Sequence, residues 1–314
     1  MVSARSERAQ LILVGSITIA LVIVGLTVVV NTVLFTESVG SSSLDNRIDE
    51  TSEFDSEVIS GTRSLVFRLG HNSRNVTERE LRAWVTSNIT RYSRAAAQSY
   101  AASRPVAVSV NFSNASAIGN RTVQSTDRNI TDNSGTEDWT VVSAKTVGWF
   151  TLNVDAFDTS TDHLYVNASN ATSGNWVNIS INRTQRNNVS VTSAVSFADD
   201  GQGTCTPVDG RVLLDLYAGA SLTNSLSPCT FNGTSILDAP YSIRVTNGKN
   251  LVGKYSLVTA ETLSAYPACD GLSPAAADPC VAPVLWTANV STAFEGESIS
   301  HVNTYNVSIY GDDR

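Results

Sequence analysis

The chain has 314 residues, with 21 Lys and Arg against 29 Asp and Glu, a net charge of −8 and a pI near 4.9. An acidic chain with only three lysines lacks the basic patches that nucleic acids require, so nucleic acid is excluded as a partner. The length is sufficient for one large or two small hydrophobic cores.

Residues 11–35, LILVGSITIALVIVGLTVVVNTVLF, carry no charge. At about 1.5 Å per residue they make a helix of roughly 37 Å, which is long enough to cross a hydrocarbon layer of about 30 Å. A cleaved secretory signal has a shorter apolar region and a small-residue cleavage site, which this sequence lacks. The pattern therefore predicts a transmembrane helix over 11–35, with the lipid bilayer as partner.

The residues that flank this segment predict its orientation. Residues 1–10 contain Arg5 and Arg8, whereas the other side is acidic, so 1–10 are expected in the cytoplasm and Thr36 onward outside the cell. This makes the chain a single-pass protein of the cell membrane. Arg8, Ala9 and Gln10 are a candidate processing site of the prepilin-peptidase kind, at which cleavage would leave the apolar helix on the mature protein.

Residues 36–104 favour helices. A 4-3 spacing predicts a stalk helix that packs partly on its own domain. The apolar positions of its stripe are Leu44, Ile48, Val58, Leu65 and Leu69, and polar residues interrupt the stripe at Thr51, Asp55 and Thr62. Thr77 and Glu80 form a capping-box pattern at the start of a second, amphipathic helix. Its apolar face, interpreted as core including the Trp and the Tyr, is Leu81, Trp84, Val85, Ile89, Tyr92 and Ala96.

Residues 105–314 change to short alternating runs separated by Asn, Gly, Asp and Ser, and predict a β-rich extracellular domain. The expected strands are Val106–Phe112, Trp139–Ala144, Val147–Phe157, His163–Asn167, Trp176–Asn182, Val189–Phe197, Val212–Tyr217, Tyr241–Thr246, Leu251–Thr259, Val284–Thr292 and Val302–Ile309. The fold class is therefore α+β: an N-terminal transmembrane helix and helical stalk, followed by an all-β sandwich-like domain. A boundary near 199–210 is the alternative to a single compound β domain.

Two hairpins and two long loops are expected within this region. The hairpins join Trp176–Asn182 to Val189–Phe197, and Tyr241–Thr246 to Leu251–Thr259 across Asn247-Gly248. The loops cover 201–207 and 266–283, and each contains cysteine.

N-x-S/T sequons are unusually frequent. Chance pairing of the 25 Asn with the 73 Ser and Thr gives about six, whereas the chain has 14, all beyond the apolar segment. They predict extracellular N-glycosylation at Asn75, Asn88, Asn111, Asn114, Asn120, Asn129, Asn167, Asn170, Asn178, Asn182, Asn188, Asn232, Asn289 and Asn306. The alternative is that a strand protein rich in Asn, Ser and Thr forms sequons by accident.

Four cysteines occur late in the chain. An even number in an exported domain predicts two disulfides, and because local closures form most easily we favour Cys205 with Cys229 and Cys269 with Cys280. The other two pairings remain open. A metal site is disfavoured because there is no C-x-x-C and no His beside any Cys.

Catalytic motifs are absent from the sequence. The three His, including His163 beside Asp162, are scattered, and no G-x-S-x-G, H-E-x-x-H or P-loop pattern occurs. Asp155, Asp158 and Asp162 lack EF-hand spacing and are interpreted as a solvated acidic loop rather than a calcium site. The sequence thus predicts a protein that is not an enzyme, without catalytic residues, metal or cofactor.

The opening residues 8–39, RAQLILVGSITIALVIVGLTVVVNTVLFTESV, resemble uncharacterised pilin-like surface proteins of halophilic archaea. This resemblance implies a hydrophobic helix, a helical stalk, a β-rich head and a glycosylated surface. Many type IV pilins carry Glu five residues after the cut, where this chain has Val14. We therefore expect an anchored, glycosylated surface protein with a structural or binding role. A processed minor pilin that contacts other pilin-like subunits through the N-terminal helix is the alternative, and a membrane-tethered hydrolase is a third hypothesis.

Overall fold

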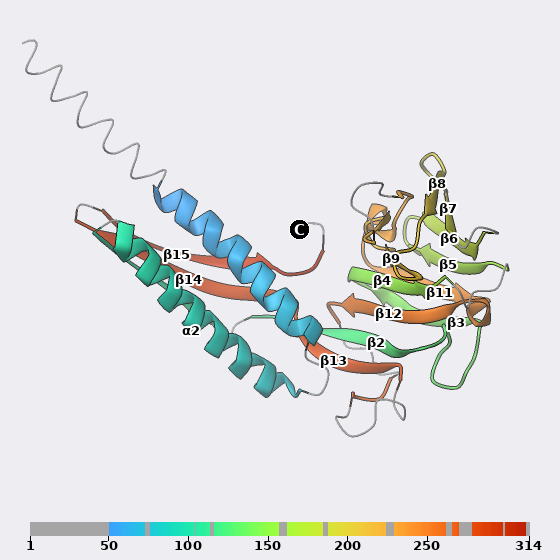
Figure 1. Cartoon of the computed structure of the whole chain (residues 1–314), viewed down its shortest axis with the longest axis horizontal. Helices are drawn as coiled ribbons and strands as arrows, with labels where there is room; N and C mark the ends of the chain where they lie inside the picture. The colour runs from blue at the N-terminus through green and yellow to red at the C-terminus, as the bar shows by residue number, and fades with distance from the viewer. Residues whose placement is uncertain are drawn as a thin grey trace, which may run out of the picture. The chain divides into compact units, whose positions relative to one another are not determined.

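The computed structural model describes residues 50–72, 76–103, 105–113, 116–156, 162–184, 188–223, 229–261, 266–269, 278–297 and 299–311 (Figure 1). The predicted start 1–10, the processing site and the predicted transmembrane helix 11–35 lie outside them. Within the described ranges, no helix is both long and apolar enough to cross a membrane. Contacts divide the chain into two compact units, Met1–Glu57 and Val58–Arg314.

The described strands form three antiparallel sheets. Sheet A has the order β1-β14-β15, sheet B the order β10-β9-β4-β12-β2-β13, and sheet C the order β3-β11-β5-β6-β7-β8. The bounds are β1 Val106–Phe112, β2 Ile118–Asn129, β3 Trp139–Lys145, β4 Val147–Asp155, β5 Leu164–Ser169, β6 Trp176–Arg183, β7 Val189–Val195, β8 Gly201–Cys205, β9 Arg211–Asp215, β10 Ala220–Ser221, β11 Tyr241–Thr246, β12 Val252–Thr259, β13 Cys280–Leu285, β14 Thr287–Gly296 and β15 Ile299–Ser308.

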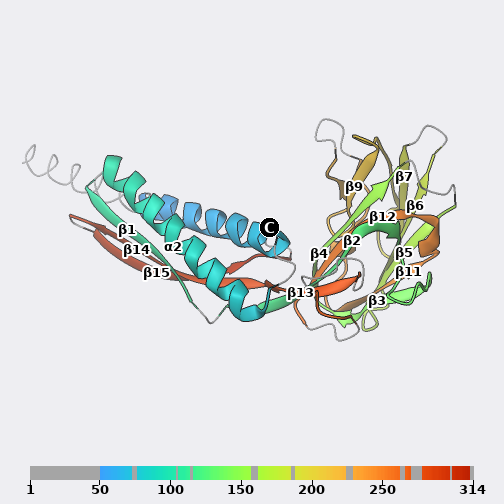
Figure 2. The same cartoon turned by 60° about the horizontal axis from the view of Figure 1, so that its bottom comes forward.

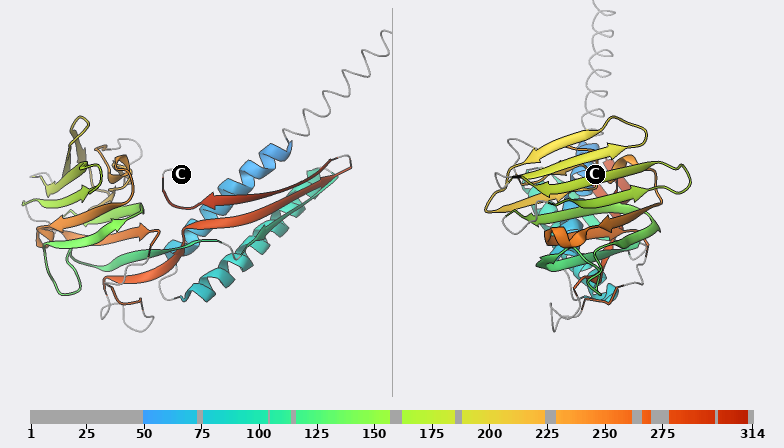
Figure 3. Two further views of the ribbon diagram at one scale, coloured as in Figure 1. Left: turned by 180° about the vertical axis from the view of Figure 1, so that it is seen from behind. Right: turned by 90° about the vertical axis from the view of Figure 1, so that its right-hand side faces the viewer.

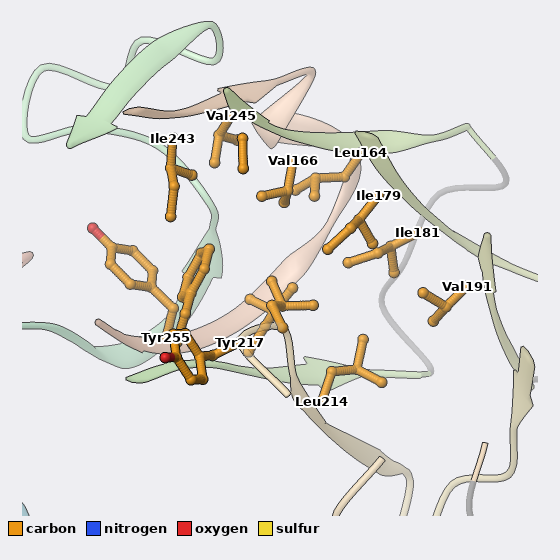
Figure 4. Close-up of a cluster of buried hydrophobic side chains, with 14 of the residues drawn as sticks. Leu164, Val166, Ile179, Ile181, Val191, Leu214, Tyr217, Ile243, Val245 and Tyr255 are labelled. Carbon is orange, nitrogen blue, oxygen red and sulfur yellow. The ribbon is translucent and has the colours of Figure 1, made fainter. Parts of the chain in front are cut away.

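Sheets B and C pack face to face and enclose the main core (Figure 4). In β6 of sheet C, Val177, Ile179 and Ile181 are each at most 1% exposed, while the residues between them are not buried. Phe150 and Leu152 of β4 supply the facing layer from sheet B. Successive strand residues point to opposite faces, so this alternation buries one face of each sheet. The sandwich-like β region expected from the sequence is confirmed.

The helix α2 (Glu78–Ser103) lies along one face of sheet A (Figure 2). Its buried residues are Leu81, Val85 and Ile89, at the helical spacing that the sequence shows. The backbone N–H of Val110 in β1 donates to the Ser93 hydroxyl at 2.9 Å. Sheet A consists of the first strand and the last two strands of the chain, and α2 packs on it as a second layer. The expected division between a helical stalk and amphipathic helix over 36–104 and a β-rich extracellular domain over 105–314 stays a prediction.

The aromatic residues of α2 differ in their environments. Trp84 is 47% exposed, so the expectation that it belongs to the core is wrong. The buried stripe is centred on residues 81, 85 and 89, and Trp84 lies at its edge. Tyr92 contacts the helix that precedes α2, helical over residues 58–72 and called the first helix, because a Cβ added at Gly61 would lie 2.7 Å from the Tyr92 hydroxyl oxygen.

The capping box at the start of α2 is present as expected. The Thr77 N–H donates to the Glu80 carboxylate at 2.7 Å, and the Glu80 N–H donates to the Thr77 hydroxyl at 3.3 Å. These hydrogen bonds hold the pKa of Glu80 below its usual value. Both orphan donors are satisfied reciprocally, as this motif requires.

We predict that Thr77→Ala lowers the free energy of unfolding by about 1 kcal/mol, because α2 loses its N-cap acceptor. Urea denaturation followed by circular dichroism measures the loss. Thr140→Ala, at an exposed position of β3, is the control and should be close to neutral. Equal midpoints for Thr77→Ala and the parent would contradict a stabilising box.

The first helix is bound at its end to sheet B. Its residues 58–72 are helical, and the Arg121 side chain of β2 reaches its last carbonyls. Arg121 is 7% exposed and donates to His71 O at 2.7 Å, to Gly70 O at 3.5 Å and to the Ser256 hydroxyl at 2.8 Å. The guanidinium thus satisfies carbonyls that the helix end leaves open, and its charge suits the negative end of the helix dipole.

Several sequence-based expectations for the strands are wrong. The segments around Asn247-Gly248 do not form a hairpin: β11 pairs with β3 and β5 in sheet C, whereas β12 pairs with β2 and β4 in sheet B. The expected loop 201–207 contains β8, which pairs with β7. The run Val284–Thr292 is divided at Trp286 between β13 and β14, which belong to different sheets. The hairpin of β6 and β7 is confirmed.

The sequence pattern does not predict strand β2, because its residues, IGNRTVQSTDRN, are mostly polar. In the structure it lies between β12 and β13, and Thr122 and Gln124 are fully buried. The Gln124 side-chain amide donates to Gly253 O at 2.9 Å, which offsets part of the cost of burying it.

Both favoured disulfides are present: Cys205 with Cys229, and Cys269 with Cys280. The first joins the end of β8, at the edge of sheet C, to the segment beside β10, at the edge of sheet B. The Ser221 N–H donates to Cys229 O at 2.9 Å, which makes this connection part of the backbone bonding at that edge.

Candidate functional site

Three sequon asparagines lie on the outer face of sheet C, which Figure 3 shows face-on in its right panel. They are Asn167 on β5 and Asn178 and Asn182 on β6. The residues next to Asn167, Val166 and Ala168, are each 1% exposed and point into the sandwich. Alternation along the strand therefore directs all three asparagines away from the core.

Three more sequon asparagines lie on the open face of sheet A, opposite to α2. Asn111 of β1 and Asn306 of β15 are exposed, and Asn289 of β14 is half-buried. Their strand neighbours Ala288, Val290 and Val307 are buried on the face that packs against α2. Because successive strand residues point to opposite faces, the asparagines point toward solvent.

The other sequons occupy varied positions. Asn75 and Asn114 lie outside the described residues, and half-buried positions are Asn88 on α2, Asn120 and Asn129 on β2, Asn188 and Asn232. Asn170 is 5% exposed: its amide donates to Asp238 O at 2.8 Å, and its oxygen accepts the N–H of Thr172 and of Ser173. Attachment of a glycan there would disrupt this turn, so Asn170 is the least suitable acceptor among the described sequons.

A pocket of about 550 Å³ lies beside the end of the first helix. Its rings are in contact: Phe67 stacks on His71 with centroids 4.1 Å apart, and Trp149 of β4 meets Phe67 edge-on at 5.0 Å. Arg63 and Arg68 add positive charge to this lining. An apolar floor with guanidinium groups at its side suits a small ligand that carries an aromatic or apolar body and a negative charge.

An ionic cluster that includes Asp155 lies on the solvent side of sheet B. Arg211 forms ion pairs with Asp127 and, at 3.9 Å, with Asp155, and Lys254 lies 3.1 Å from Asp127. Asp155 thus has the Arg211 guanidinium as an ion-pair partner. Asp158 lies outside the described residues, and none of the described His, Cys, Asp and Glu groups together as metal ligands.

Asp127 makes this cluster sensitive to acid. Burial raises the pKa of Asp127, but hydrogen bonds from Arg211 and Lys254 outweigh it and leave the pKa below its usual value. A lowered pKa contributes stability above the unfolded value of about 3.9, and this stability is lost as the pH falls through the folded value.

We predict that Lys254→Met weakens the acid dependence of stability between about pH 5 and pH 2, because Asp127 then has a smaller difference in pKa between folded and unfolded chains. Urea midpoints measured across this range test it. Lys145→Met at the end of β3 is the matched control. The prediction fails if Lys254→Met and Lys145→Met give the same dependence on pH.

A serine and a histidine that no sequence motif pairs lie close together in the structure. The His163 ring lies 2.6 Å from the Ser180 hydroxyl, and both belong to the outer face of sheet C. A nucleophilic serine acts in a water-excluded site with an oriented base, whereas His163 is exposed. Ser180 is also the third residue of the Asn178 sequon.

No family model matches the sequence, and no match was found among curated proteins. Among solved structures, the chain is similar to the native heptameric SAP-like pentraxin from Limulus polyphemus, with 13% identity and a TM-score of 0.25. The match covers 58% of this chain and 95% of the pentraxin chain. A likeness this distant assigns no function to the chain.

Proposed function

We propose that the chain is an N-glycosylated cell-surface protein, held in the membrane by residues 11–35, with its β domain outside the cell in a structural or binding role. The observation that carries the proposal is the position of the sequons. Six of their asparagines lie on the open faces of sheets A and C, where a bulky, solubilising glycan meets no core residue.

The two disulfides support the same compartment. Structural disulfides persist in oxidising surroundings, and each of these joins described segments of the exported part. In this proposal the outer faces of sheets A and C are covered by sugar. The basic aromatic pocket then offers a surface for a ligand that sequons do not occupy. The proposal includes no catalytic activity.

The test is performed on full-length protein purified from its native membrane. Intact mass and peptide mapping are expected to show an intact N-terminus and sugar on peptides from sheets A and C. Protease treatment of whole cells is expected to remove the β domain. Bare asparagines at every sequon would overturn the proposed glycosylation. A β domain that is protected from protease in intact cells would overturn the proposed orientation.

The alternative is a processed, pilin-like subunit of a surface filament. It is favoured by the bonds from Arg121 to the end of the first helix, because a filament subunit must transmit load from its helix to its head. A mature N-terminus at Gln10 would support this alternative. An N-terminus at Met1 or Val2, without cleavage before Gln10, would support the anchored protein instead.

A further inference from the structure

We propose that the sequons include two mutually exclusive pairs, Asn167 with Asn178 and Asn289 with Asn306, and that each folded molecule carries one glycan per pair, mainly at Asn178 and Asn306. The inference rests on the proposed glycosylation and adds the occupancy of particular sites to it. Its basis is the register of the strands, which places the two members of each pair directly opposite each other.

In sheet C, Asn167 of β5 is the partner of Asn178 of β6. The flanking residues Val166 and Val177 are each 1% exposed and point into the core, so both asparagines point to the same outer face. Directly opposed residues on antiparallel strands have Cβ atoms about 4.5–5.5 Å apart.

Sheet A repeats this arrangement. Asn289 of β14 is the partner of Asn306 of β15, while Val290 and Val307 are buried on the face toward α2. Both side chains of this pair therefore stand on the open face of the sheet, again at the spacing of directly opposed residues.

Two glycans at this spacing compete for one volume. The first sugar on each side-chain amide is bulky, and the pleat directs both amides along the same normal to the sheet. The order of events does not remove the conflict. Asn167 and Asn178 are eleven positions apart in sequence, so both can be modified before β5 and β6 pair, but pairing then forces the two sugars together. Doubly modified chains are therefore excluded from the folded population.

Each asparagine of a pair also has surroundings on the side away from its partner, and these determine which of the two carries the glycan. Asn167 lies opposite the long side chain of Arg244 in β11, whereas Asn178 lies opposite the small Ala194 in β7. In sheet A, Asn289 is on the central strand, whereas Asn306 is on the edge strand β15 and is exposed. A glycan on Asn178 or Asn306 has free space beside it, so these positions are the main acceptors.

Tryptic mapping of the full-length protein from its native cells tests the proposal. No Lys or Arg lies between Lys254 and Arg314, so one peptide, Tyr255–Arg314, contains Asn289 and Asn306 and no other sequon. After reduction, we expect this peptide with one glycan, located by fragmentation mainly at Asn306. A peptide that carries two glycans in the folded protein overturns the proposal. So does a bare peptide when other sequons are occupied.

Single variants give the second test. Asn306→Gln is expected to shift the glycan to Asn289, and Asn178→Gln to shift it to Asn167, with the total per pair unchanged. Asn88→Gln on α2, which belongs to neither pair, is the control and should leave both pairs as they are. If Asn289 stays bare in Asn306→Gln, the proposal is wrong. Sugar-free peptides throughout the chain would overturn the proposed function as well, so the two failures are distinguishable.

Discussion

Arg121→Ala is expected to lower the free energy of unfolding by about 3 kcal/mol, because the loss of the charged donor leaves the Ser256 hydroxyl and the carbonyls of Gly70 and His71 without this partner. Gly70 and His71 lie at the end of the first helix, so the loss is also expected to loosen that helix from sheet B. Urea denaturation gives the energy. Hydrogen exchange of the amides in residues 58–72 gives the local effect.

Two variants make this prediction selective. Arg121→Lys keeps the charge but not the planar fork, and is expected to recover part of the loss. Arg244→Ala removes an exposed arginine from β11 and should change stability by less than about 0.5 kcal/mol. Equal midpoints for Arg121→Ala and Arg244→Ala would show that the Arg121 hydrogen bonds contribute nothing net. All three changes leave the sequons intact.

Replacing both Cys205 and Cys229 by alanine is expected to lower the free energy of unfolding by about 3 kcal/mol, because the closed loop between them no longer restricts the unfolded chain. The two residues are 24 positions apart, whereas Cys269 and Cys280 are separated by 11, so the entropic model predicts a slightly smaller loss for the second pair. Thermal and urea unfolding of the two double variants measure the difference.

The position of the first disulfide adds a local expectation. Cys205 ends β8 and Cys229 lies beside β10, so the bond holds the edges of sheets C and B together. Amides of β8 should exchange faster in the Cys205→Ala and Cys229→Ala double variant than in the variant that lacks the other disulfide. The same β8 exchange in both would contradict an edge-closing role.

Local features of this protein could be predicted from the sequence. The capping box of Thr77 and Glu80 depends on residues three positions apart, and the buried stripe of α2 repeats with the helical turn. The alternation in β6 predicts which residues enter the sandwich. Both disulfides join cysteines that are near in sequence, and the sequons are defined by three consecutive residues. These patterns report local backbone geometry and the side of an element that is buried.

Only the tertiary structure decided which elements meet. The sequence gives no sign that β11 and β12 belong to different sheets, because an Asn-Gly turn is equally compatible with a hairpin and with a crossing between layers. The polar strand β2 is buried because Gln124 and Arg121 find partners on distant segments. The opposition of Asn289 and Asn306 likewise depends on register. Strand pairing is set by contacts between residues far apart in the chain, whereas local periodicity indicates which face of a strand is buried but not which strand lies beside it.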